Sequence, residues 1–129
     1  MRSEPDTNTD ELAKAVIDAA IEVHRILGPG YLESVYEEAL AVELDLRNIP
    51  FERQKSVAVD YKGQSVGEGR LDLLVGGCLI VELKAADALA PIHTAQVISY
   101  LKATRLPLGL VINFNVPVLK DGVKRIILS

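Results

Sequence analysis

The chain lacks several features that would place it in a specialised class. Its 129 residues contain no apolar run approaching the roughly 18–20 residues that cross a bilayer. The polar N-terminus, MRSEPDTNTDE, offers no apolar stretch for a signal peptide. Cys78 is the single cysteine and cannot form an internal disulfide. These absences argue against a membrane protein or a disulfide-stapled one, and we expect a cytoplasmic location.

Basic charge is also scarce, because the chain carries a net charge of −4. Residues 1–11 hold one arginine against four acids, a net of −3, which leaves −1 for the remainder. We therefore expect residues 1–10 to be a disordered acidic leader and residues 11–129 to be a single domain. A near-neutral body argues against strong, sequence-independent binding to nucleic acid. It does not exclude an enzyme that binds phosphates through a metal ion.

What the chain does contain begins with two helical patterns. Thr9 or Asp10 is a good N-cap for a helix that the apolar spacing carries to Leu27, where Gly-Pro-Gly stops it. A second helix is predicted over residues 32–46 and closes before Pro50. Its expected buried face consists of Val35, Ala39, Val42 and Leu46, widened by Leu40 and Leu44.

The pattern then changes to strands. Residues 51–61 alternate, with Val57, Val59 and Tyr61 on one side. Further strands are predicted over residues 65–75, 78–85, 108–114 and 123–128, with a helix over residues 92–103. The resulting order, α-α-β-β-β-α-β-β, predicts an α/β sandwich around a mixed sheet.

The hairpin at Gly76-Gly77 can pair in two registers. A two-residue turn would place Asp72 opposite Val81 and would mix carboxylates with aliphatics on both faces. A loop one residue longer gives one apolar face, made of the facing pairs Leu71–Leu83, Leu73–Val81 and Val75–Leu79. Since a one-residue slip exchanges the faces, burial favours the longer loop. The hydrophobic pattern therefore predicts that Asp72 lies beside Glu82.

Two facing carboxylates repel each other, and a hard divalent cation removes the conflict. We therefore predict a Mg²⁺ or Mn²⁺ site at Asp72 and Glu82. Lys84, two residues further along the strand, projects from the same face as Glu82 and can orient a water or offset the charge of a phosphate. The alternative is a surface charge cluster in which Arg70 and Lys84 neutralise the two acids.

Three helical residues could extend this site. Gln96 and Tyr100 are four residues apart and share one helix face, where their polar tips suit a substrate phosphate or base. Alternatively, Tyr100 is half-buried with a solvated hydroxyl, and Gln96 faces solvent. Glu33 lies in the first turn of the second helix, where the helix dipole alone would be sufficient reason for a carboxylate.

The segment from Leu27 to Tyr36, LGPGYLESVY, resembles the signature of the GxxExxY proteins, bacterial and archaeal members of the PD-(D/E)XK nuclease superfamily. The likeness runs from about residue 16 to residue 128. It includes Val23-His24, Arg53-Gln54, Asp72, the run Glu82-Leu83-Lys84, the run from Gln96 to Tyr100, and the closing Ile112-Asn113-Phe114. Leu71 stands where the superfamily's name has a proline.

The resemblance implies a restriction-endonuclease-like core in which Asp72, Glu82 and the carbonyl of Leu83 ligate Mg²⁺. It also implies that Lys84 is catalytic and that Glu33 approaches as a further acid. Gln96 and Tyr100 are similar to the QxxxY element of exonuclease-like members of the superfamily.

Two functions remain open at this point. The first is a Mg²⁺- or Mn²⁺-dependent nuclease that hydrolyses DNA phosphodiester bonds by attack of water. The second is a binding or regulatory module for nucleic acid or protein that retains the nuclease fold with little catalysis. The apolar excess is also compatible with a homodimer.

Overall fold

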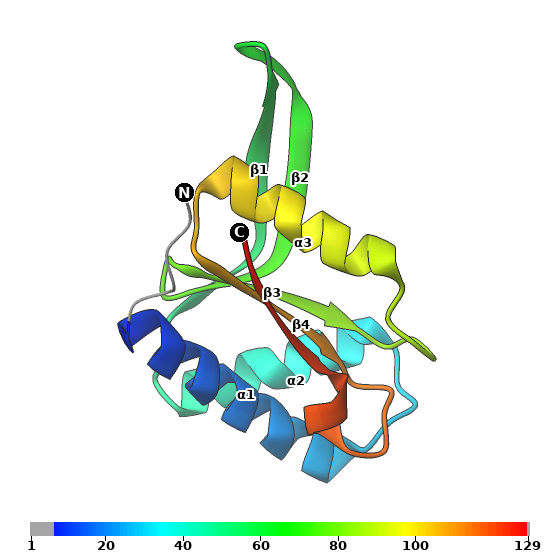
Figure 1. Cartoon of the computed structure of the whole chain (residues 1–129). Coiled ribbons are helices and arrows are strands. Elements are labelled where there is room, and N and C mark those ends of the chain that lie inside the picture. Colours follow the sequence, from blue (N-terminus) through cyan, green and yellow to red (C-terminus); the bar gives the residue numbers. More distant parts are fainter. Residues whose placement is uncertain (1–6, 129) are drawn as a thin grey trace.

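The computed structural model describes residues 7–128 and places three helices around one sheet (Figure 1). The elements, in order, are α1 (Thr7–Leu27), α2 (Glu33–Leu46), β1 (Phe51–Tyr61), β2 (Gln64–Val75), β3 (Leu79–Lys84), α3 (Pro91–Thr104), β4 (Leu108–Asn113), the 3-10 turn η1 (Leu119–Gly122) and β5 (Val123–Ile127). The predicted order of helices and strands is confirmed, with η1 added before the last strand. None of the described helices is both long enough and apolar enough to span a membrane.

The sheet is mixed, as predicted, and its strands follow the order β1-β2-β3-β4-β5. All neighbouring pairs are antiparallel except β3 and β4, which are parallel. Parallel neighbours need a crossover connection, and α3 supplies it. In Figure 1, α1 and α2 cover one face of the sheet and α3 covers the other. The end of β3 therefore lies between two helical layers.

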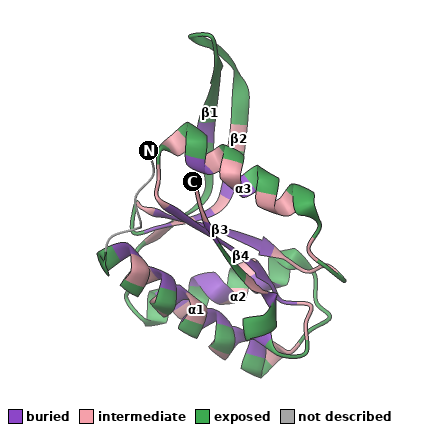
Figure 2. Ribbon diagram, in the orientation of Figure 1, coloured by how far each residue is buried: buried purple, intermediate pink, exposed green. Residues whose placement is uncertain are grey.

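Two apolar clusters hold these layers together. The larger one joins α1 and α2 to the sheet through residues such as Val16, Leu40 and Leu110. The smaller one packs Val97 and Leu101 of α3 against the opposite face. Figure 2 shows the buried positions concentrated in the central strands and the inner helix faces. Most of the burial that stabilises the fold therefore lies on the α1–α2 side.

The start of α1 differs from the prediction. Residues 1–6 of the expected disordered leader lie outside the described part of the chain, whereas Thr7 to Asp10 form the first turn of α1. Thr9 is buried, and Asp10 forms an ion pair with Arg125 of β5. Thr9 and Asp10 therefore lie inside α1, and neither residue is its N-cap.

The predicted buried face of α2 is correct in part. Leu40 and Leu44 are buried as predicted, whereas Val35, Val42 and Leu46 are exposed, and Tyr36 and Ala41 are buried instead. Tyr36 determines which face is buried. Its ring stacks on Phe114, with ring centroids 4.5 Å apart, and its hydroxyl donates a hydrogen bond to the carbonyl of Gly28 at 2.6 Å. A large aromatic ring with a satisfied hydroxyl gains more from burial than the smaller Val35 does.

The hairpin of β1 and β2 extends well beyond the body of the protein (Figure 1). Of the three residues predicted on one side of β1, only Val57 is buried, while Val59 and Tyr61 are exposed. Val66 on the facing strand is exposed as well. The outer half of the hairpin is therefore a two-stranded ribbon that no described helix covers.

Candidate metal centre

The register of the β2–β3 hairpin is the one predicted from the hydrophobic pattern. Leu73 faces Val81 and Val75 faces Leu79, with a three-residue loop between the strands. Gly76 and Gly77 adopt φ values of 59° and 70°, a left-handed conformation that glycine tolerates at no steric cost. The loop therefore sets the alignment that brings Asp72 and Glu82 together.

Beyond the Leu73–Val81 pair, the two acids themselves connect the strands. The backbone N–H of Asp72 donates to Oε2 of Glu82 at 2.7 Å. The backbone N–H of Leu83 donates to Oδ2 of Asp72 at 2.8 Å. Each carboxylate thus accepts a hydrogen bond from the other acid's strand, which locks both side chains at the point where the ladder stops.

Leu71 departs from the predicted pattern at this point. It was expected on the same apolar face as Leu73, but it packs in the cluster beneath α3 with Ile80 and Leu101. The paired residues of β2 and β3 end at Leu73 and Val81, so β2 can turn relative to β3 before it enters the projecting hairpin. Strict alternation holds only where both strands share one ladder.

The environment of the two acids opposes their ionisation. Glu82 is only 3% exposed. Burial, together with the neighbouring negative charge of Asp72, raises the pKa of Glu82 to about 8. Burial also raises the pKa of Asp72, against the hydrogen bond from Leu83. The Lys84 ammonium opposes both shifts without forming a direct ion pair with either acid in the described structure.

This donor set fits a hard divalent cation. Each carboxylate uses one oxygen for a backbone hydrogen bond, and its second oxygen accepts none from residues 7–128. Two close carboxylates, one buried and one half-buried, are costly without a compensating positive charge, and Mg²⁺ binds one or two carboxylates together with waters. Within residues 7–128, no three His, Cys, Asp or Glu side chains converge on one metal position. A metal here would therefore need a backbone oxygen and waters beside the two acids.

Lys84 lies at the last position of β3, where its backbone is held from the neighbouring strand. Its carbonyl accepts a hydrogen bond from the N–H of Phe114 at 2.9 Å. Asn113 then clamps Ala86, since its amide donates to the Ala86 carbonyl at 2.9 Å and accepts from the Ala86 N–H at 3.0 Å. These bonds fix the chain just after Lys84 and limit the positions that its ammonium can reach.

Helix α2 brings the negative charges of both Glu33 and Glu37 to the site, whereas the sequence analysis predicted only Glu33. Glu33 raises the pKa of both Asp72 and Glu82, so its negative charge acts on the pair. Glu37, one turn further along, raises the pKa of Asp72 as well and was missed. The spacing of four residues between Glu33 and Glu37 could have indicated it, because such residues share one helix face.

Glu37 is held in place by two residues of β1. Arg53 donates to Oε2 of Glu37 at 2.9 Å and to Glu38 at 2.6 Å, and the amide of Gln54 donates to Oε1 of Glu37 at 2.9 Å. Gln54 has a φ of 51°, which is unusual for a residue with a side chain. Backbone strain of this kind persists where surrounding contacts enforce it, and here the glutamine amide is aimed at the carboxylate.

Gln96 and Tyr100 occupy different positions relative to the acids. The ring of Tyr100 lies directly over Gly69, where a Cβ atom would come within 2.5 Å of the ring. Its hydroxyl is 3.4 Å from the N–H of Arg70, two residues before Asp72, so Tyr100 borders the site. Gln96 is exposed and forms no hydrogen bond with residues 7–128. The structure therefore brings Tyr100 next to the strand that carries Asp72, whereas Gln96, one helical turn earlier, is exposed.

A mixed five-stranded sheet with flanking helices and two facing acids at a strand junction is the arrangement of a restriction-endonuclease-like fold. A family model described as the PD-(D/E)XK nuclease superfamily matches residues 10–126, so the chain belongs to this superfamily. Comparisons with curated proteins and with solved structures gave no significant match.

Proposed function

We propose that this protein is a divalent-metal-dependent nuclease that hydrolyses phosphodiester bonds of DNA. The observation that carries the proposal is the interlocked pair of Asp72 and Glu82, with Lys84 close to both. Superfamily membership supports nuclease chemistry. The segment from Leu27 to Tyr36 further supports placement among the GxxExxY proteins.

In this proposal, Asp72, Glu82 and the carbonyl of Leu83 hold Mg²⁺ or Mn²⁺. When bound, the ion supplies charge stabilisation for the phosphate and lowers the pKa of a bound water. The Lys84 ammonium orients the attacking water and stabilises the negative charge that develops on the phosphate. Glu33 approaches from α2 as a further acid. Tyr100 and Gln96 contact the DNA on the α3 side.

The test is DNA hydrolysis with Mn²⁺ or Mg²⁺ by the wild type and three variants, Asp72→Asn, Glu82→Gln and Lys84→Ala. We expect each variant to lose a factor of about 10² to 10³ in rate, the loss typical of removing one electrostatic contact to a transition state. Asp18→Asn, a change of the same charge on the exposed surface of α1, is the matched control and should leave the rate unchanged.

Calorimetric titration with Mn²⁺ supplies a readout that does not depend on activity. Asp72→Asn and Glu82→Gln should weaken Mn²⁺ binding, because each removes a ligand. Lys84→Ala should not weaken it, because Lys84 is not a ligand. Equal DNA hydrolysis by all four proteins would reject the assignment of the site.

One observation favours the alternative of a binding module with little catalysis. The two acids are not joined by a third converging acidic, histidine or cysteine side chain in the described part of the chain. A site with so few charged ligands could bind a metal weakly. Calorimetry that detects binding of DNA or a protein partner, together with no hydrolysis in the presence of Mn²⁺, would support this module instead.

A further inference from the structure

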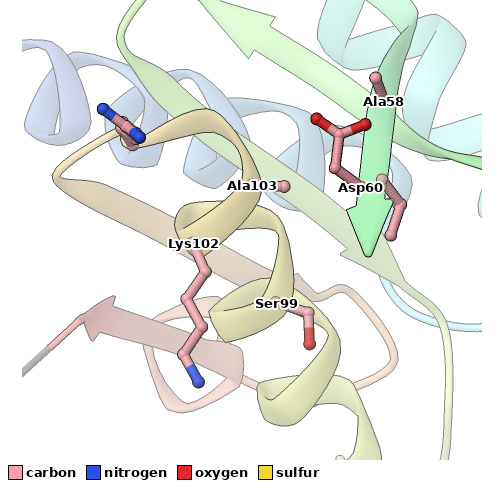
Figure 3. Close-up of a pocket in the computed structure, with 7 residues that line it drawn as sticks. Ala58, Asp60, Ser99, Lys102 and Ala103 are labelled. Carbon is pink, nitrogen blue, oxygen red and sulfur yellow. The ribbon is translucent and has the colours of Figure 1, made fainter. Parts of the chain in front are cut away.

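A hollow lies in the corner between α3 and the projecting hairpin. Ala58, Val59 and Asp60 of β1 form one wall, and Ser99, Lys102 and Ala103 of α3 form the other. Arg105 closes the end of the corner, and the hollow has a volume of about 400 Å³. Figure 3 shows Asp60 projecting from β1 on one side and Ser99 and Lys102 on the helix opposite it.

The charges in this corner favour an anionic occupant. Lys102 and Arg105 are exposed, and neither forms an ion pair with any residue in the described range of 7–128. Residues 91–106, which include all of α3, contain no aspartate or glutamate. Asp60 is the one acidic residue that lines the hollow, so the lining holds two cations against one anion. Uncommitted cations on an acid-free helix are suited to phosphate contacts.

Helix α3 borders both this corner and the strand that carries Asp72. Gln96, Ser99 and Ala103 are exposed and follow one another at helical spacing, so they form a single stripe. Tyr100 lies beside this stripe, and its hydroxyl reaches Arg70, two residues from Asp72. The stripe carries small or neutral side chains, which allow a nucleic-acid backbone to lie close to the helix.

The hairpin stands beside the exposed stripe of α3, so a DNA strand bound along the stripe would lie against the hairpin. Gly67 of β2 faces Val59 of β1 and has open space beside it, whereas the ring of Tyr100 covers Gly69. Tyr61 and Lys62 are exposed at its tip. A two-stranded ribbon has dimensions that fit a groove of duplex DNA.

A second copy of the chain is a weaker candidate for the same surface. β1 is an edge strand and could in principle pair with another β1. Its backbone is irregular at two places, however, at Gln54 with a φ of 51° and at the register shift between Val59 and Asp60. Irregularities of this kind, together with Lys55 on the strand and Lys62 in the turn directly after it, hinder pairing between edges.

We propose that the corner between α3 and the hairpin binds the phosphate backbone of DNA that extends to the metal centre, with Lys102 and Arg105 as its phosphate contacts. This inference rests on the proposed nuclease function and names the surface that would hold its substrate. Asp60 limits the affinity, since its carboxylate faces the same hollow.

The experiment measures binding of a fluorescein-labelled DNA duplex of about 20 base pairs by fluorescence anisotropy, in EDTA so that no hydrolysis occurs. The test protein combines Lys102→Ala with Arg105→Asn, because asparagine tolerates the left-handed conformation of position 105, where φ is 58°. The control combines Lys14→Ala with Lys120→Ala and removes the same charge from exposed positions on α1 and η1. Thermal melting confirms that both proteins are folded.

We expect the Lys102 and Arg105 variant to bind about tenfold more weakly or worse at 0.1 M salt, with the slope of log affinity against log salt reduced by about two. The control should bind as the wild type does. Asp60→Asn should bind more tightly than the wild type, because it removes the opposing charge. These three results together support the inference.

Two results would overturn the inference. The first is that the wild type and the Lys102 and Arg105 variant bind DNA with equal affinity and equal salt dependence. A wild type that binds no DNA counts as the same result. The other is a wild-type dimer, seen by sedimentation, that the same variant abolishes. A separate hydrolysis assay with Mn²⁺ or Mg²⁺ distinguishes failure of the nuclease function. A wild type that binds DNA through Lys102 and Arg105 but hydrolyses none would reject the nuclease function and leave this inference standing.

Discussion

Helices α2 and α3 lie on opposite faces of the sheet and differ in charge. α2 contains five acidic residues and no lysine or arginine, whereas α3 contains no acidic residue and one lysine, with Arg105 directly after it. Asp72 and Glu82 lie between these layers. Under the proposed function this contrast would divide the roles, because negative potential from α2 would attract a cation to the acids and the α3 side would leave room for an anionic substrate.

The same contrast shows why the net charge describes the distribution of charge in this molecule poorly. Residues 1–52 hold twelve acids and four lysines or arginines, whereas residues 53–129 hold six acids and ten lysines or arginines. The two parts therefore carry charges of −8 and +4, and their sum is the net charge of −4. A nearly neutral total therefore conceals a polarised molecule, and only the fold shows that the basic part includes α3 and the hairpin.

The largest expected effect concerns where the stability resides. Leu40 and Leu101 are both fully buried, Leu40 in the larger cluster beneath α2 and Leu101 in the smaller cluster beneath α3. We expect Leu40→Ala to lower the free energy of unfolding by about 3–5 kcal/mol and Leu101→Ala by about 2–3 kcal/mol. The smaller cluster can relax more readily around a cavity. Urea denaturation measures both values, and a larger loss at Leu101 would reverse this view of the two faces.

The next effect is the pH dependence of stability without a divalent cation. The folded pKa of Glu82 is about 8, above its ordinary value of 4.5, so the folded state binds more protons than the unfolded state between these values. Stability should therefore fall as the pH rises from 5 to 8, by about 3 kcal/mol if Glu82 acts alone. Glu82→Gln should remove most of this fall. Denaturation in EDTA at several pH values measures it.

A divalent cation should reverse this pH dependence. Mn²⁺ competes with protons for the two carboxylates, so it should stabilise the wild type more at pH 8 than at pH 5. Glu22 and Glu38 behave differently from the acid pair, because their arginine partners lower the pKa of each. Their titration would change the stability only at more acidic pH. A wild type whose stability in EDTA is flat from pH 5 to 8 would contradict the account of the buried pair.

The acid pair could be predicted from the sequence because its position depends on local rules. Gly76 and Gly77 fix the loop, and the apolar residues on both strands permit only one register. The face of α2 could not be predicted in the same way. Val35 and Tyr36 both suit a helix, and the choice depended on Phe114, which is distant in the sequence and stacks on Tyr36.

The surroundings of the acids also depended on distant contacts. Glu37 reaches the site because Arg53 and Gln54 hold it, and Gln54 adopts a backbone conformation that its residue type does not indicate. The projection of the hairpin could not be predicted either, because the alternation in residues 56–61 is the same for a covered strand and for an uncovered ribbon. Local patterns therefore predicted the positions of Asp72 and Glu82, and long-range packing determined which residues surround them.

The smallest expected effect tests whether the acids of α2 act through their position or only through their number. Glu33→Gln and Asp45→Asn each remove one negative charge from α2, but only Glu33 influences Asp72 and Glu82. We expect Glu33→Gln to weaken Mn²⁺ binding by about two- to fivefold at low salt, the range of a partly screened charge interaction, and Asp45→Asn to leave it unchanged. The difference should shrink at 0.5 M salt because screening weakens interactions across solvent. Calorimetric titration at both salt concentrations measures it, and equal effects of the two substitutions would mean that α2 contributes only a general negative field.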